Sequence, residues 1–143
     1  MNSQEPNYLH GFSSVEQARL MKQARLLENT IFGNIDYTGV RRLLEVGSGV
    51  GAQTEILLRR FPELHVTCVD LNEAQLTAAS HNLAATPWCA DRYSVQQADA
   101  TNLPFAPRHF DAAFLCWILE HVPAPARALN EVRRVLAPGS PVY

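Results

Sequence analysis

From residue 41 onward, hydrophobic and polar positions along the chain follow two alternating patterns. Short apolar runs, typical of buried strands, are separated by longer stretches in which apolar residues recur every three or four positions, as on one face of a helix. The expected strands are residues 43–46, 65–69, 93–98 and 111–116. One expected helix follows the first strand and is stopped by Pro62, one is capped by Asn72 with Gln75 in the reciprocal position, and one covers residues 125–136.

A different pattern precedes residue 41. Ser13 and Glu16 have the spacing of a capping box, which predicts the start of a helix. Apolar residues then recur at helical spacing until a stop near Gly33, at Val15, Ala18, Met21, Ala24, Leu27 and Ile31. We therefore expect a single amphipathic helix here. The chain divides into an N-terminal arm and cap helix, residues 1–40, and a core, residues 41–143.

Strands that alternate with helices form βαβ units, and these build a parallel sheet covered on both faces. Right-handed crossovers make the expected fold α/β and doubly wound, similar to the Rossmann fold. In such sheets a ligand binds at the carboxyl ends of the strands, near the point where the strand order reverses. Candidate functional residues are therefore sought directly after each strand.

The first strand runs into a glycine-rich turn, Gly47-Ser48-Gly49-Val50-Gly51. Glycines allow a tight turn and let a ligand approach the backbone, whose free N–H groups at the helix start can bind an anionic group. Asp70 ends the second strand, where a carboxylate can accept hydrogen bonds from both hydroxyls of a ribose. Alternatively, the glycines form only a tight turn and Asp70 only caps a helix. Together these features fit a nicotinamide dinucleotide and S-adenosylmethionine almost equally.

Composition narrows the class of protein. The chain has 143 residues, 47% hydrophobic and 18% charged, which is typical of one globular domain. A net charge of −2 and the absence of a polybasic tail argue against nucleic acid or anionic lipid as a partner. We also expect no membrane segment, because no apolar run is long enough to span a bilayer.

The cysteines and histidines do not suggest a metal site. Cys68, Cys89 and Cys116 are far apart and odd in number, which indicates a reducing compartment, the cytoplasm, and not a disulfide framework. No Cys or His spacing matches a zinc site, so we expect no metal. His121 is a weak candidate for a general base.

Four further motifs decide between the two cofactors. They are residues 98–105 after the third strand, Phe110-Asp111 before the fourth, Leu119-Glu120-His121-Val122 after it, and residues 134–139 at the end of the last helix. In this order the motifs resemble the class I S-adenosylmethionine-dependent methyltransferases, in particular the small-molecule enzymes of ubiquinone and menaquinone biosynthesis. The resemblance runs from Leu43 to Gly139 and implies methyl transfer to a small-molecule acceptor.

The resemblance also implies a role for each candidate residue. Glu45, Gly47, Ser48, Gly49 and Gly51 would hold the methionine part of the cofactor, with Glu45 at its amino end. Asp70 would bind the ribose hydroxyls, and Leu71 would pack against the adenine. The adenine edge would be bound by the Asp99 carboxylate and the Ala100 N–H, and the sulfonium would lie between Cys116 and Trp117. In this family type the Glu-His pair at His121 is usually structural.

The sequence departs from the family near its last residue. Cys68 replaces a common glycine, Ser140 replaces a second glycine, and the chain stops at Tyr143, where a fifth strand begins. We therefore expect a fragment of a longer protein, or self-association through an uncovered sheet edge beside the fourth strand. Two alternatives stay open: a module or partner subunit that binds the cofactor without catalysis, and a nicotinamide-dependent enzyme. The acceptor cannot be read from the sequence.

Overall fold

The computed structural model describes residues 13–143, and the expected arm over residues 1–12 lies outside this range. Four strands form one sheet in the order β3-β2-β1-β4, and all neighbours are parallel. The strands are β1 (Arg42–Val46), β2 (His65–Asp70), β3 (Tyr93–Gln97) and β4 (Ala112–Leu115). The strand order reverses between β1 and β4, so the carboxyl ends of these two strands form the switch point.

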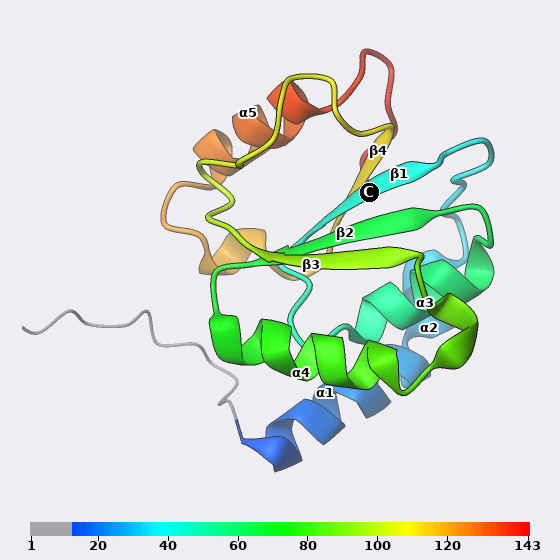
Figure 1. Ribbon diagram of the computed structural model, residues 1–143. Helices are drawn as coiled ribbons and strands as arrows, with labels where there is room; N and C mark the ends of the chain where they lie inside the picture. The colour runs from blue at the N-terminus through cyan, green and yellow to red at the C-terminus, as the bar shows by residue number, and fades with distance from the viewer. Residues whose placement is uncertain (1–12) are drawn as a thin grey trace, which may run out of the picture.

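Helices cover both faces of the sheet, as expected for a doubly wound fold (Figure 1). One face carries the N-terminal helices α1 and α2 together with α3 and α4, and the other carries α5. The helices are α1 (Ser14–Leu26), α2 (Glu28–Phe32), α3 (Ala52–Arg60), α4 (Glu73–Ala84) and α5 (Pro125–Val135), with short 3-10 turns η1 (Pro87–Cys89) and η2 (Leu119–His121). None of the helices described is long and apolar enough to cross a membrane.

Alternating side chains of the strands divide the core into two hydrophobic clusters. Leu43 of β1 packs toward α3, whereas Leu44 and Val46 pack toward α5. This alternation follows from the period of two in a strand. It places the Glu45 side chain on the α3 face, inside the hydrophobic core.

The N-terminal helix differs from the expectation of a single helix. The chain turns at Leu27, so that α1 and α2 are separate elements. Phe32 of α2 stacks on Phe114 of β4 with ring centroids 5.3 Å apart. Val15, expected on the buried face, is 78% exposed. Ser13 Oγ accepts from the Glu16 N–H as the capping box requires, and the Glu16 carboxylate pairs with Arg19.

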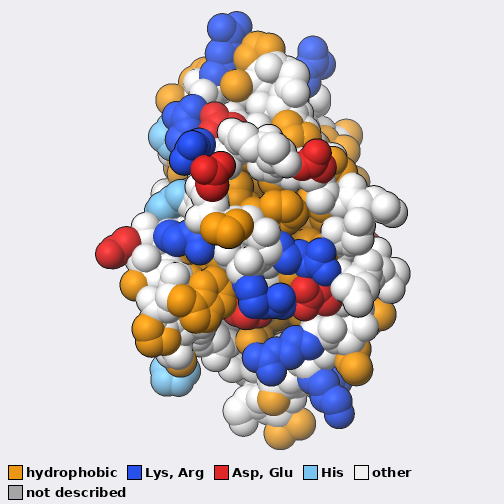
Figure 2. Space-filling model, turned by 90° about the vertical axis from the view of Figure 1, so that its right-hand side faces the viewer, with side chains coloured by type: hydrophobic (Ala, Val, Ile, Leu, Met, Phe, Trp, Pro, Cys, Tyr) orange, Lys and Arg blue, Asp and Glu red, His pale blue; other side chains and the backbone are white. Residues whose placement is uncertain are grey.

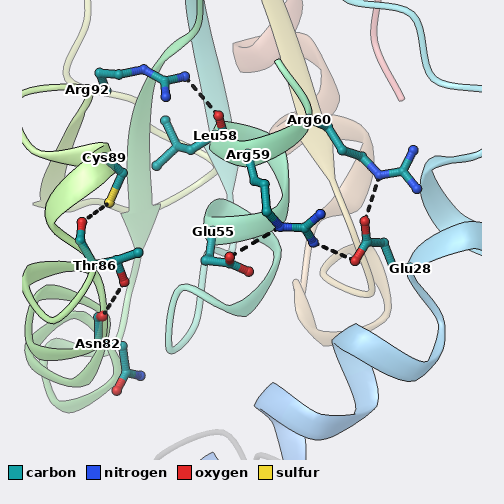
Figure 3. A network of polar contacts seen from close by, with 9 residues as sticks. All are labelled: Glu28, Glu55, Leu58, Arg59, Arg60, Asn82, Thr86, Cys89 and Arg92. Carbon is teal, nitrogen blue, oxygen red and sulfur yellow. Dashed lines mark hydrogen bonds and ion pairs between the residues drawn. The ribbon is translucent and has the colours of Figure 1, made fainter. Parts of the chain in front are cut away.

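Ionic contacts join α2 to α3 (Figure 3). Both oxygens of Glu28 are used, one with Arg59 Nη2 at 2.6 Å and the other with Arg60 Nε at 2.9 Å. The two arginines end α3, so that Glu28 fixes the N-terminal helices on the helix that follows the glycine turn. On the side of the molecule shown in Figure 2, cationic and anionic side chains are intermixed. Among the charged side chains, Arg59 and Arg60 make ion pairs with Glu28.

We expected the outer edge of β4 to be uncovered, but in the structure another segment pairs with it. Residues 141–143 run parallel to it: the Ala113 N–H donates to Pro141 O, and the Leu115 N–H donates to Tyr143 O. This short segment has the position of a fifth strand. Val142 remains 47% exposed and lines a groove with Leu129 of α5.

Candidate functional site

A cavity of ≈ 260 Å³ opens at the switch point, where β1 and β4 end. Its floor is the glycine turn after β1, and its sides come from α1, the start of α3, the first turn of α4 and the segment after β4. The lining residues are Leu20, Gln23, Gly47, Ser48, Gly49, Val50, Ala52, Gln53, Gln75, Cys116, Trp117, Glu120 and His121. The cavity therefore lies where a doubly wound sheet binds its ligand.

Glycine is favoured at the three positions of the turn for different structural reasons. Gly47, Gly49 and Gly51 all have positive φ, between 53° and 81°, a region that side chains disfavour. A Cβ at Gly47 would lie 2.6 Å from Ile118, and one at Gly51 would lie 3.4 Å from Ala79 of α4. A Cβ at Gly49 meets no atom within 4 Å. Gly49 thus leaves open space beside the cavity, whereas Gly47 and Gly51 allow close packing behind it.

Glu45 is buried below the glycine turn. Its Oε2 accepts a 2.5 Å hydrogen bond from Thr54 Oγ1 of α3 and lies 3.9 Å from Cys68 Sγ of β2. Burial in the core raises the pKa of the Glu45 carboxyl to about 8. Glu45 is not among the cavity-lining residues, although it lies two positions before Gly47, which is one of them.

Asp70 supports the glycine turn directly. Its Oδ2 accepts from the Gly49 N–H at 2.9 Å, and its Oδ1 accepts from the Asn72 N–H at 2.9 Å. Burial raises the pKa of the Asp70 carboxyl, and the hydrogen bonds from the Asn72 and Gly49 backbone oppose this effect. The Leu71 backbone also donates to this carboxylate, which keeps capacity to accept one more hydrogen bond from a ligand hydroxyl.

The residues expected to hold an adenine lie at the same edge of the sheet but outside the cavity lining. Leu71 follows β2 and is 60% exposed. Asp99 follows β3, and its Oδ1 accepts from both the backbone N–H and the hydroxyl of Thr101, at 2.8 and 2.7 Å. Ala100 is next to it. These three residues lie at the edge of the sheet where β2 and β3 end, and they are not part of the cavity lining beside the glycine turn.

The segment after β4 forms the opposite wall. Cys116 accepts a long 3.9 Å contact from Gln53 Nε2 of α3, and burial raises the pKa of its thiol to about 11, so the thiol is protonated at neutral pH. Trp117 has φ 54°, rare for a bulky residue, and is 46% exposed. His121 Nε2 lies 3.4 Å from Glu120 Oε1.

Five cavity-lining residues were not identified as site residues, or as part of a site motif, by the sequence analysis. They are Leu20 and Gln23 of α1, Ala52 and Gln53 of α3, and Gln75 of α4. Two of them belong to the N-terminal helix that we expected to form a cap. For Gln75, the sequence offered only its place in the capping pattern with Asn72. The spacing of hydrophobic residues along the chain does not identify a buried polar residue beside a ligand-binding edge.

Comparisons with known proteins agree with this geometry. Residues 44–143 match the family described as methyltransferase domain. The chain is 35% identical over 98 residues to demethylmenaquinone methyltransferase of Clavibacter sepedonicus, covering 68% of this chain and 38% of that protein. A crystal structure from Methanococcus maripaludis superimposes with a TM-score of 0.75 at 19% identity, covering all of this chain and 66% of that one. The structure of the [4+2]-cyclase SpnF gives 0.64 at 30% identity, covering 90% and 44%.

The matches are limited in length. The chain spans between 25% and 48% of the curated relatives compared with it. Within the chain, however, the family match begins in β1 and includes the glycine turn, Asp70 and the segment after β4. The fold, the position of the cavity and the match over residues 44–143 lead to one conclusion: this chain belongs to the methyltransferase domain family.

Proposed function

We propose that this chain binds S-adenosylmethionine and is the cofactor-binding part of an enzyme that transfers a methyl group to a small-molecule acceptor. The observation that carries the proposal is the cavity at the switch point, two of whose lining residues have a buried polar atom without a partner. Ser48 Oγ and Gln75 Oε1 have no hydrogen-bond partner within residues 13–143. Buried polar atoms are rarely unpaired unless a ligand or water completes them.

The residues present fit the cofactor. Gly49 leaves space for a ligand to contact the turn, and Asp70 is held at the end of β2 with capacity to accept one more hydrogen bond. We expect Glu45, Gly47, Ser48, Gly49 and Gly51 to surround the methionine part. We expect Asp70 to bind the ribose, Leu71, Asp99 and Ala100 to hold the adenine, and Cys116 and Trp117 to flank the sulfonium.

The chemistry places modest demands on the protein. S-adenosylmethionine supplies a methyl group already activated by its sulfonium, so the protein has to align donor and acceptor and exclude water. The Trp117 ring can stabilise a nearby cation through its π face. Residues 13–40 form the cap, through Leu20 and Gln23, and residues 41–143 form the core. His121 can act as a base if the acceptor must lose a proton.

The experiment compares ligands and one substitution. S-adenosylhomocysteine should raise the melting temperature of the wild type, whereas NAD at the same concentration should not. Asp70→Asn should weaken S-adenosylhomocysteine binding in calorimetry by roughly 1–3 kcal/mol, because a charge-assisted hydrogen bond is lost. The control, Asp36→Asn, changes a carboxylate that likewise binds a nearby backbone N–H, that of Thr38, outside the cavity lining. A wild type that prefers NAD, or equal affinities for both variants, would contradict the assignment.

One solved structure with this fold, SpnF, is described as a [4+2]-cyclase and not as a methyltransferase. A methyl-transfer assay is therefore needed beside the binding test. Binding without turnover in the full-length protein would favour the alternative of a non-catalytic module.

Two further proposals concern partners and location. We infer that copies of this chain self-associate through the edge formed by residues 141–143, where Val142 and Tyr143 are exposed. We also infer a cytoplasmic location, supported by the absence of a disulfide among Cys68, Cys89 and Cys116.

A further inference from the structure

The segment that follows β3 is bound to α5 by two charged side chains. Glu131 and Arg134 are three residues apart on this helix, and Arg134 Nε donates to Glu131 Oε1 at 2.8 Å. The Arg134 guanidinium lowers the pKa of the Glu131 carboxyl, so both side chains are charged at neutral pH. α5 contributes no residue to the cavity lining, so this pair does not line the candidate site itself.

Both side chains bind the backbone of the segment. Glu131 Oε2 accepts from the Leu103 N–H at 2.8 Å, and Arg134 Nη2 donates to Leu103 O at 2.8 Å. Arg134 Nη1 also donates to Phe105 O at 2.8 Å. The guanidinium is planar and its donors have fixed directions, so one arginine sets the positions of two carbonyl groups at once.

Packing and a further hydrogen bond hold the same segment. The Leu103 side chain is 3% exposed and lies in the hydrophobic cluster on the α5 face, together with Val132. Arg127 Nε, nearer the start of α5, donates to Thr101 O at 3.2 Å. Figure 1 shows the segment after β3 beside α5. Residues 101–105 are therefore bound to this helix at several positions along their length.

The turn directly after β3 lies between two anchors. On one side, the Ala98 N–H donates to Asp70 O at 3.0 Å, which continues the pairing of β3 with β2. On the other side is Leu103, whose N–H and C=O are both bound by α5. The Asn102 N–H donates to Asp99 O at 2.9 Å and closes the turn between them. The place of the Asp99 carboxylate and of the backbone N–H that follows it therefore depends on α5.

We propose that Arg134 is a positioning residue for base recognition, which holds the turn after β3 where the Asp99 carboxylate and the Ala100 N–H bind the adenine edge. This inference rests on the proposed function, in which these two groups bind the adenine. It adds to that function a dependence of base specificity on a helix outside the cavity. The amino group of the base donates to the carboxylate and a ring nitrogen accepts from the N–H, so a displaced turn weakens both contacts.

The test compares two ligands that differ only at the base. S-adenosylhomocysteine carries adenine, whereas S-inosylhomocysteine carries hypoxanthine, in which an oxo group replaces the amino group and the adjacent ring nitrogen bears a proton. The wild type should bind the adenine ligand at least about tenfold more tightly, because hypoxanthine reverses both hydrogen bonds. Calorimetry measures this ratio of affinities. A change in stability affects the binding of both ligands equally, so the ratio reports the geometry of the turn.

Arg134→Gln should lower the ratio at least about threefold, because the turn is no longer held by the guanidinium. Arg134→Lys takes its place if the glutamine variant does not fold. An ammonium keeps the charge beside Glu131 but cannot bind both carbonyl groups as the guanidinium does, so the ratio should fall there too.

The control is Arg42→Gln, which removes another arginine–carboxylate pair of 2.8 Å, that of Arg42 with Asp111. This pair lies at the amino ends of β1 and β4, away from the edge that carries the candidate site. Arg42→Gln should leave the ratio unchanged.

An unchanged ratio in Arg134→Gln, or in Arg134→Lys where the glutamine variant does not fold, would overturn the inference. An equal fall in Arg42→Gln would also overturn it, since that result indicates a general effect of losing an ion pair. A wild type that binds neither ligand would contradict the proposed function, and one that binds both equally would contradict the adenine contacts. These failures can therefore be told apart from a failure of Arg134 to position the turn.

Discussion

At the scale of single residues, burial controls the chemistry of Glu45. The side chain lies in the core between β1, β2 and α3, where its carboxyl group accepts a hydrogen bond from Thr54 and lies near Cys68. The Thr54 hydrogen bond opposes the effect of burial without cancelling it, and the pKa rises from 4.5 to about 8. Near neutral pH the folded protein therefore binds a proton that the unfolded chain does not.

This difference predicts how stability depends on pH. Because the folded-state pKa is the higher one, the contribution of Glu45 is fully present below about pH 4.5 and is lost as the pH rises toward about 8. Relative to Glu45→Gln, which stays neutral, the wild type should lose about 1.4 kcal/mol of unfolding free energy per pH unit inside this window. Urea unfolding of both proteins at three pH values measures the difference. Parallel pH profiles would show that Glu45 ionises normally.

At the scale of elements, the contact between α2 and α3 connects the N-terminal cap to the site. Glu28 binds both arginines at the end of α3, and these hydrogen bonds lower the pKa of its carboxyl (Figure 3). Because α3 begins directly after the glycine turn and α1 contributes Leu20 and Gln23 to the cavity, the same contact positions two walls of the site.

Glu28→Gln should therefore destabilise the protein by about 1 kcal/mol, since two partly buried ion pairs are lost. Thermal unfolding should show a decrease of roughly 2–5 °C. The control is Glu63→Gln, because the ion pair of Glu63 with Arg41 is 3.5 Å long and both side chains are at least 60% exposed. Equal decreases in melting temperature for the two substitutions would mean that the α2–α3 contact stabilises the protein no more than an exposed ion pair does.

At the scale of the whole molecule, the sheet has two different edges. β3 forms one edge, and at the other residues 141–143 pair with β4. Val142 and Tyr143 of this short segment are exposed, and Val142 and Leu129 line a groove whose other lining residues include Arg108, Arg133 and Arg134. Unprotected edges of this kind pair readily with other chains.

Sedimentation velocity at low micromolar concentration should reveal concentration-dependent dimers of this chain. Val142→Lys should abolish them, because a charged side chain at an edge opposes strand pairing. Val15→Lys is the control, since Val15 is 78% exposed on α1. A wild type that stays monomeric, or dimers that persist in Val142→Lys, would rule out this edge as the interface.

Much of the architecture could be predicted from the sequence because its signals are local. Apolar runs located all four strands to within two residues, and Asn72 accepts from the Gln75 N–H as its capping position predicts. The turn at Leu27 could not be predicted, because Leu27 fits the helical period. In the structure α2 makes long-range contacts with α3 and β4, which the local pattern does not contain.

The candidate site was predicted less completely than the fold. The motifs located the glycine turn and the wall at Cys116 and Trp117, which line the cavity. Gln75 was missed, because a sequence shows the spacing of a residue on a helix and not whether its polar atoms find a partner. The pairing of Asp99 with Thr101 was also unforeseen, since short local hydrogen bonds of this kind occur at many turns.

The position of Trp117 has a practical consequence for the ligand titrations. The chain contains two tryptophans, and both indoles are about half exposed, Trp117 in the cavity lining and Trp88 in η1, outside it. Indole emission depends on contact with water, so a ligand that covers Trp117 changes the fluorescence of one of these two emitters. The protein therefore carries its own optical reporter of cavity occupancy, and neither a label nor an acceptor substrate is needed to follow binding.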